Sequence, residues 1–242
     1  MSAPLRVGVI GLGARCVIAE NCHKATIPAE LVGGCDPNPA MRQRATEVLG
    51  DYPWFETLDE LLELGIDCAI VTSPDDTHED ITCALLEAGV AVYLEKPIAI
   101  TIEGSDRVLE TAYRTKTPLY VGHNMRHMAV VRILRQVVQD GLIGEVRAIW
   151  CRHFVGNGGD YYFKDWHADR SRTTGLLLQK AAHDIDVMNW LSDSVPERVV
   201  GMGDLMLYGK LSDRSGQKSD AVMGDWFSFD NWPPASLTGL NT

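Results

Sequence analysis

A glycine-rich turn directly after the first apolar run most constrains what this chain can fold into. Leu5–Ile10 has the near-continuous apolarity of a strand covered on both faces, and Gly11-Leu12-Gly13 follows it. Gly11 permits a tight turn, and Gly13 lets the backbone approach a pyrophosphate at the start of the next helix. Cys16 stands where a third glycine would be expected and is small enough for that position. Alone, the motif fits an ordinary glycine turn about as well as a nucleotide site.

The segments that follow alternate between strand-like and helix-like patterns. Further short apolar runs are Leu31–Cys35, Cys68–Thr72, Val90–Leu94 and Leu119–Val121. Between them, apolar residues recur at helical spacing, in one helix expected to begin at Thr77 and stop at Gly89, and in another at Arg107–Lys116. This alternation predicts an α/β fold, with βαβ units that build a doubly wound parallel sheet of the Rossmann type.

The pattern changes after Gly122, so we expect a Rossmann domain at 1–122 and an incomplete α+β domain with an open sheet at 123–242. The elements expected in the second part are two helices, at Ala129–Asp140 and Ala181–Leu191, and two strands, at Val146–Val155 and Arg198–Leu207. These elements are too few to close a core, because sheets generally need three or more strands or a helical cover. We therefore expect the chain to be truncated.

Residues at the ends of the expected strands strengthen the nucleotide hypothesis. Asp36 would accept hydrogen bonds from the adenosine ribose hydroxyls and would repel a 2′-phosphate, so NAD is favoured over NADP. Its alternative role is a helix cap before Pro37. Ser73, Pro74 and His78 fall at the sheet edge where open α/β sheets bind ligands. A structural role for His78 at the helix start is an equal alternative.

Glu95-Lys96-Pro97 ends the run Val90–Leu94, and a charged pair there is hard to explain as packing. With it, the chain resembles the GFO/IDH/MocA family of glucose–fructose oxidoreductase and inositol dehydrogenase. The segments that carry the resemblance are TSPDDTHED (72–80), LEKPIAIT (94–101), VGHNMRH (121–127), GLIGEV (141–146) and KAAHDIDVMNWL (180–191). The resemblance implies a two-domain NAD(P)-dependent oxidoreductase that acts on a sugar or cyclitol hydroxyl and whose full-length form is a homo-oligomer.

The resemblance also assigns residues to the site. It implies that Lys96 lies beside the nicotinamide and the substrate hydroxyl, with Glu95, Leu12 and Asn124 on the cofactor. His183 corresponds to a histidine of the family's late helical motif. Oxidation of an alcohol releases a proton, which a histidine of pKa near ~6.5 can accept, while a lysine stabilises the developing alkoxide. We therefore expect Lys96 to position the hydroxyl and His183 to act as general base, with a packing role as the alternative for His183.

Several residues around this motif are candidates for substrate contact. Many relatives carry an aspartate four residues before the histidine, and this chain has Gln179, which cannot take up a proton. Lys180 is expected either at the substrate or on the helix surface. Trp166 and His167 have side chains that suit sugar rings or that simply cover a loop. Arg126 either binds substrate or anchors the turn between domains.

Composition narrows the function classes. The net charge is −11 with no basic cluster, which argues against nucleic acid. No apolar run approaches the ~20 residues that span a bilayer. The six cysteines form no CxxC pair and no metal-ligand spacing, so we expect reduced thiols, no metal and a cytoplasmic location. Two alternatives to a dehydrogenase remain open: a relative that uses NAD to cleave glycosidic bonds, and a catalytically impaired dinucleotide-binding protein.

Overall fold

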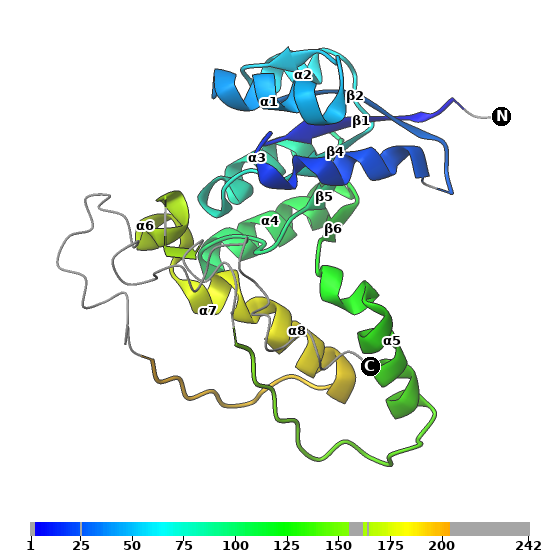
Figure 1. Ribbon diagram of the computed structural model, residues 1–242, viewed down its shortest axis with the longest axis vertical. Helices are drawn as coiled ribbons and strands as arrows, with labels where there is room; N and C mark the ends of the chain where they lie inside the picture. Colours follow the sequence, from blue (N-terminus) through cyan, green and yellow to red (C-terminus); the bar gives the residue numbers. More distant parts are fainter. Residues whose placement is uncertain (1–2, 25, 155–161, 164, 204–242) are drawn as a thin grey trace, which may run out of the picture.

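One parallel sheet forms the centre of the molecule in the computed structural model, which describes residues 3–24, 26–154, 162–163 and 165–203. The strand order is β3-β2-β1-β4-β5-β6, and every pairing is parallel (Figure 1). The strands are β1 (Leu5–Ile10), β2 (Ala29–Cys35), β3 (Trp54–Phe55), β4 (Cys68–Val71), β5 (Ala91–Leu94) and β6 (Leu119–Val121). The Rossmann prediction is confirmed, and the order reverses between β1 and β4, where such sheets bind ligands.

Helices connect these strands as the alternation predicted. They are the 3₁₀ segments η1 (Ala14–Lys24) and η2 (Asp75–Thr77) and the helices α1 (Pro39–Leu49), α2 (Leu58–Leu62), α3 (His78–Glu87) and α4 (Ile102–Thr115). α4 begins earlier than expected because Thr101 caps it, accepting a hydrogen bond from the backbone of Gly104. Thr77 precedes α3, but its side chain makes no capping hydrogen bond.

Two apolar clusters cover the two faces of the sheet. Along β4, Ile70 packs in one cluster, while its neighbours Ala69 and Val71 pack in the other, because successive strand residues point to opposite faces. The first cluster includes Cys16 of η1 and Ala45 of α1, and the second includes side chains of α2, α3 and α4. No described residue beyond 119 belongs to either cluster. The hydrophobic core of the described part of the chain is therefore that of the Rossmann part.

Beyond β6 the chain leaves the sheet as short helical segments (Figure 1). They are η3 (Asn124–His127), α5 (Ala129–Gln139), η5 (Asp165–Ala168), α6 (Arg170–Thr173), α7 (Leu176–Gln179) and α8 (Ala181–Ser192). α5 and α8 pack against each other. Of the described residues after 121, Val131 is the one buried hydrophobic side chain. The buried polar side chains there are Thr173, Gln179 and His183.

The two strands expected after α5 and α8 are wrong in their described parts. Residues 146–154 and 198–203 form no strand, and their apolar side chains are open to solvent, as at Trp150 and Val200. A strand is stabilised by a partner that takes its backbone hydrogen bonds, and no described segment pairs with either stretch. The remaining positions, 155 and 204–207, lie outside the described residues. No described helix combines the length and apolarity needed to cross a membrane.

Candidate functional site

The glycine turn lies at the carboxyl end of β1 and has one crowded and one open glycine. Gly11 has a φ of +84°, and a Cβ there would collide with the backbone of Ser73. Around Gly13 nothing lies within 4 Å of the position that a Cβ would take. Position 11 therefore requires glycine, because its φ is positive and the backbone of the segment after β4 leaves no room for a Cβ atom. Gly13 leaves its backbone open to a ligand, and the helix expected after it is the 3₁₀ helix η1.

Asp36 holds this turn from the end of β2. Its carboxylate accepts hydrogen bonds from the backbone of Leu12 at 2.9 Å and of Asn38 at 2.8 Å. Asn38 is the residue that caps α1, so the alternative of Asp36 as that helix cap is wrong. Each carboxylate oxygen has two lone pairs, so Asp36 retains acceptors for hydroxyl groups.

Two arginines of α1, which the sequence did not single out, lie against the same turn. Arg42 donates to the carbonyl oxygen of Asp36 at 2.6 Å, and Arg44 donates to that of Gly13 at 2.8 Å. The two guanidinium groups reach different backbone oxygens of the same edge, one at the end of β2 and one in the glycine turn. Cationic groups therefore stand beside the acidic residue on which the preference for NAD rests.

The histidine at the start of α3 is almost completely buried. One ring nitrogen of His78 lies 2.6 Å from the carbonyl oxygen of Pro97, and the other lies 2.9 Å from that of Ser73. The imidazole thus connects the end of β4 to the segment after β5, which is the kind of structural role given above as the alternative for His78. Ser73 and Pro74 are half-buried at that edge, and the Ser73 hydroxyl lies 2.7 Å from the Thr77 hydroxyl.

Glu95 connects the strand β5 to the glycine turn. Its buried carboxylate accepts hydrogen bonds from the guanidinium of Arg15, a half-exposed residue of η1. Arg15 follows the glycines by two positions and is a residue that the sequence analysis missed. The pair brings the expected phosphate-binding turn and the Glu95-Lys96-Pro97 segment to the same edge of the sheet.

Lys96 lies next to Gln179 and to a buried carboxylate. Its amine donates a hydrogen bond to the backbone oxygen of Gln179 at 2.7 Å. The side-chain amide of Gln179 in turn donates to Asp75 at 3.3 Å. Burial lowers the pKa of Lys96, and the negative charges of Asp75 and Glu95 partly offset this; burial also raises the pKa of Asp75. Asp75 lies in the segment TSPDDTHED, but nothing in one sequence distinguishes it from Asp76.

His183 lies on α8 among cationic groups. Its ring is 6.4 Å from that of His123, and its Nδ1 atom has no hydrogen-bond partner among the described residues. Burial, reinforced by the charges of Lys96 and Lys180, lowers the pKa of His183 to about 4. The pKa of His183 therefore lies below the ordinary histidine value of ~6.5. At neutral pH this imidazole is uncharged, which leaves it able to accept a proton.

The substrate candidate on η3 is held by α8. Arg126 forms two hydrogen bonds with the Asp186 carboxylate, at 2.8 and 2.5 Å, and its guanidinium lies over the ring of Trp190. This is the anchoring alternative expected for Arg126. Asn124, at the start of the same segment, is exposed. Lys180 is partly buried between α7 and α8.

The aromatic candidates lie in a segment that is fastened to the Rossmann part. Trp166 and His167 stack with ring centroids 3.7 Å apart, and the Arg172 guanidinium lies over the Trp166 ring. Arg172 also forms a two-point ion pair with Asp76, with both hydrogen bonds at 3.0 Å. We call the contacts of Arg172 with Asp76 and of Gln179 with Lys96 and Asp75 the junction, because they join the Rossmann part to the segments after residue 165.

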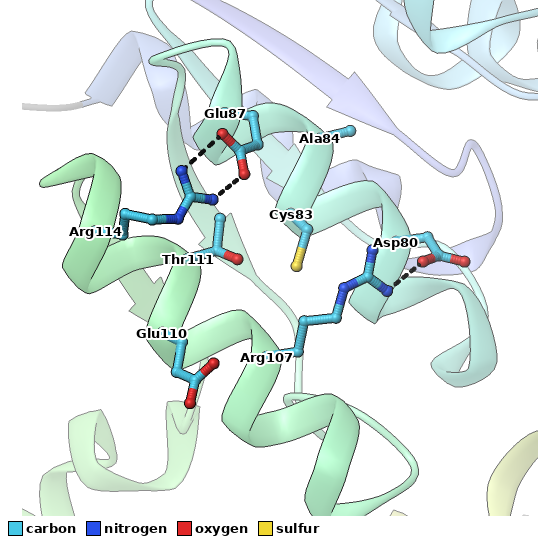
Figure 2. A pocket seen from close by; sticks show the side chains of 8 residues that line it. All are labelled: Asp80, Cys83, Ala84, Glu87, Arg107, Glu110, Thr111 and Arg114. Atoms are coloured by element: carbon cyan, nitrogen blue, oxygen red, sulfur yellow. Dashed lines mark hydrogen bonds and ion pairs between the residues drawn. The ribbon is translucent and has the colours of Figure 1, made fainter.

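A surface hollow of about 430 Å³ lies elsewhere, between α3 and α4 (Figure 2). Figure 2 shows Arg114 and Arg107 bridging to carboxylates of the facing helix, Glu87 and Asp80. These ion pairs join four of the charged side chains that line the hollow. None of the site residues expected from the sequence lines it. The chemistry expected from the sequence is therefore gathered at the carboxyl edge of the sheet, around Lys96.

Two family models match the chain. Residues 5–123 match GFO_IDH_MocA, described as "Oxidoreductase family, NAD-binding Rossmann fold". Residues 131–223 match GFO_IDH_MocA_C3, the C-terminal domain of the same family. The division expected at residue 122 stays a prediction.

Curated relatives and solved structures point the same way. The chain is 30% identical to inositol 2-dehydrogenase of Serratia proteamaculans, over 78% of this chain and 55% of the relative, and 27% identical to that of Rhizobium meliloti, over 90% and 64%. It superposes on scyllo-inositol dehydrogenase from Lactobacillus casei, solved with NAD(H) and scyllo-inositol, with a TM-score of 0.67 and 25% identity, covering 79% of this chain and 57% of that one. The chain spans about half to two thirds of the length of these relatives.

Proposed function

Because this chain belongs to the GFO/IDH/MocA family of oxidoreductases, we propose that it transfers a hydride between NAD and a hydroxyl-bearing carbon of a sugar or cyclitol. The observation that carries the proposal is the arrangement at the carboxyl edge of a Rossmann sheet of Lys96, a partly buried amine hydrogen-bonded to Gln179, and His183, a buried imidazole whose pKa the Lys96 charge lowers. Relatives named inositol 2-dehydrogenase support a cyclitol as the substrate class.

The residues at the sheet edge fit a bound dinucleotide. The backbone at Gly13 is open where a pyrophosphate would approach, and Asp36 retains acceptors for the ribose hydroxyls. Glu95 and Lys96 follow β5, which β4 separates from β1, and the nicotinamide end is expected there. Bound NAD supplies the carbon that exchanges a hydride with the substrate.

In this proposal Lys96 and His183 have different roles at the substrate oxygen. The Lys96 ammonium has three donors and uses one of them on Gln179, so the others are free to hold a hydroxyl and stabilise the alkoxide that forms. His183 is uncharged at neutral pH and accepts the proton that the hydroxyl loses. Placing that proton next to two lysines is unfavourable, so we expect it to pass on to water.

The proposal is tested by measuring NAD binding and NADH formation with a panel of inositols and hexoses. We expect NADH with at least one cyclitol, and a loss of about 10²-fold or more in kcat for Lys96→Met with NAD affinity largely kept. Lys24→Met, at an exposed position of η1, is the matched control. Undiminished turnover in Lys96→Met would remove this residue from the mechanism.

Chromogenic glycosides run beside the panel separate the remaining alternatives. Release of free sugar without net NADH would replace the proposal with NAD-dependent glycoside cleavage. Tight NAD binding with neither product would replace it with a dinucleotide-binding protein that has lost catalysis.

A further inference from the structure

Gln179 links the ionisable side chains of Lys96 and Asp75, which make no direct hydrogen bond to each other. Its backbone oxygen accepts from the Lys96 amine at 2.7 Å, and its side-chain amide donates to the Asp75 carboxylate at 3.3 Å. Gln179 is 3% exposed and Asp75 6%, so water does not screen this chain of contacts. A buried carboxylate held by a neutral amide is unusual, because buried charges are normally paired.

The charges around Lys96 single out Asp75. The charged groups that shift the pKa of the Lys96 amine are Asp75, Glu95, Lys180 and Arg15. The charge of Lys96 in turn lowers the pKa of three imidazoles, those of His183, His123 and His167. Glu95 has its own cationic partner in Arg15. The groups that act on Asp75 are His78, Gln179, Lys96 and Asp76, and Asp76 is paired with Arg172. Asp75 is therefore the carboxylate whose charge is left to act on Lys96.

The geometry points to Asp75 as a positioning residue, which acts through Gln179 to keep the Lys96 amine charged and directed into the site. This inference rests on the proposed function, since it concerns the same amine. A direct ion pair between Lys96 and Asp75 would occupy a donor and lower the effective charge offered to a substrate oxygen. With Gln179 between the two side chains, the Asp75 carboxylate stabilises the charge on Lys96. The remaining N–H groups of the Lys96 ammonium stay available to a substrate.

The test measures the protonation of Lys96 without cofactor or substrate. Lysine labelled with ¹³C at Cε gives a pH-dependent NMR signal, which Lys96→Arg assigns. We expect Asp75→Asn to lower the pKa of Lys96 by about one unit, because an opposite charge nearby is worth about 1–3 units. Asp80→Asn, which changes an exposed carboxylate on α3, is the matched control and should leave this signal unmoved. An unshifted Lys96 in a folded Asp75→Asn protein would overturn the inference.

An exchange variant separates charge from shape. Asp75→Asn combined with Gln179→Glu keeps an amide facing a carboxylate and only reverses which side donates. We expect it to return the pKa of Lys96 to within about 0.3 units of the original value and to recover most of the turnover. A purely structural role for Asp75 predicts no shift of the Lys96 pKa in the single variant and therefore no shift for the exchange to reverse. Failure of the exchange to return the pKa in a folded protein would count against the inference.

A third variant serves if Asp75→Asn does not fold. Gln179→Met keeps the backbone oxygen and the carboxylate but removes the amide hydrogen bond that helps to keep Asp75 ionised, so the pKa of the Lys96 amine should fall. An unchanged or raised pKa in the folded variant would refute the inference. NADH formation, measured separately, tests the proposed function. A shifted Lys96 without turnover would refute that function alone, and normal turnover with an insensitive Lys96 would refute the positioning role alone.

Discussion

The buried imidazole on α8 makes the stability of this protein depend on pH in a defined direction. Burial and neighbouring cations lower the pKa of His183 from 6.5 to about 4. At pH values between 4 and 6.5, His183 is protonated in the unfolded chain and uncharged in the folded chain. The stability is therefore fully present above pH 6.5 and is lost as the pH falls toward 4. About 2.5 units at ~1.4 kcal/mol each make roughly 3 kcal/mol from this one residue.

His183→Gln removes the titration while keeping a side chain of similar size. Urea unfolding is monitored by circular dichroism at a series of pH values from neutral to mildly acidic. We expect the free energy of unfolding to fall more steeply with decreasing pH for the unmodified protein than for His183→Gln. The difference between the two slopes should integrate to roughly 3 kcal/mol, with equal m-values. His23→Gln, at an exposed position on η1, is the control. Parallel curves for the His183→Gln variant and the unmodified protein would refute the reasoning.

Three further perturbations test other parts of the structure. Gly11→Ala forces a residue with a Cβ into a φ of +84° against neighbouring backbone, so thermal unfolding should show a loss of at least about 2 kcal/mol; an unchanged melting temperature would contradict the packing described. Asp36→Ser removes the acidic group beside Arg42, and fluorescence titration should show NADP affinity rising relative to NAD about tenfold; an unchanged ratio would separate Asp36 from cofactor choice. Arg172→Gln breaks the two-point pair with Asp76, and limited proteolysis should cut near α6 several-fold faster; equal rates would mean that the pair does not hold this segment.

The sheet was largely predictable because a parallel strand that is buried on both faces gives a nearly continuous apolar run in the sequence. The bounds of β1 agree with the expected run at Leu5–Ile10, and β6 agrees at Leu119–Val121. The two runs expected as strands near Trp150 and Val200 show the limit of this signal. Apolar, β-prone residues indicate that a strand is possible, but a partner strand is needed to form it, and that partner is not a local property of the sequence.

The sequence singles out two candidate reactive groups, Lys96 and His183, but it does not predict what surrounds them. Lys96 and His183 stand in recognisable motifs, whereas the contact of Asp75 with Gln179 joins residues 104 positions apart. The pKa of His183 could not be read from its neighbours in sequence, because its burial and the effect of the Lys96 charge arise only when α8 folds close to the segment that follows β5. Arg15 and Arg42 were missed for the same reason: an arginine on a helix is usually a surface residue.

The junction has a thermodynamic consequence. Its contacts are an ion pair and hydrogen bonds, and the apolar clusters stop before it. Exposing apolar surface raises the heat capacity and exposing polar surface lowers it. Opening the junction should therefore carry almost no heat-capacity change, while unfolding the sheet carries a large positive one. Calorimetry can thus separate two events that a single melting curve would merge. Added salt, which screens Arg172 from Asp76, should move only the first of them.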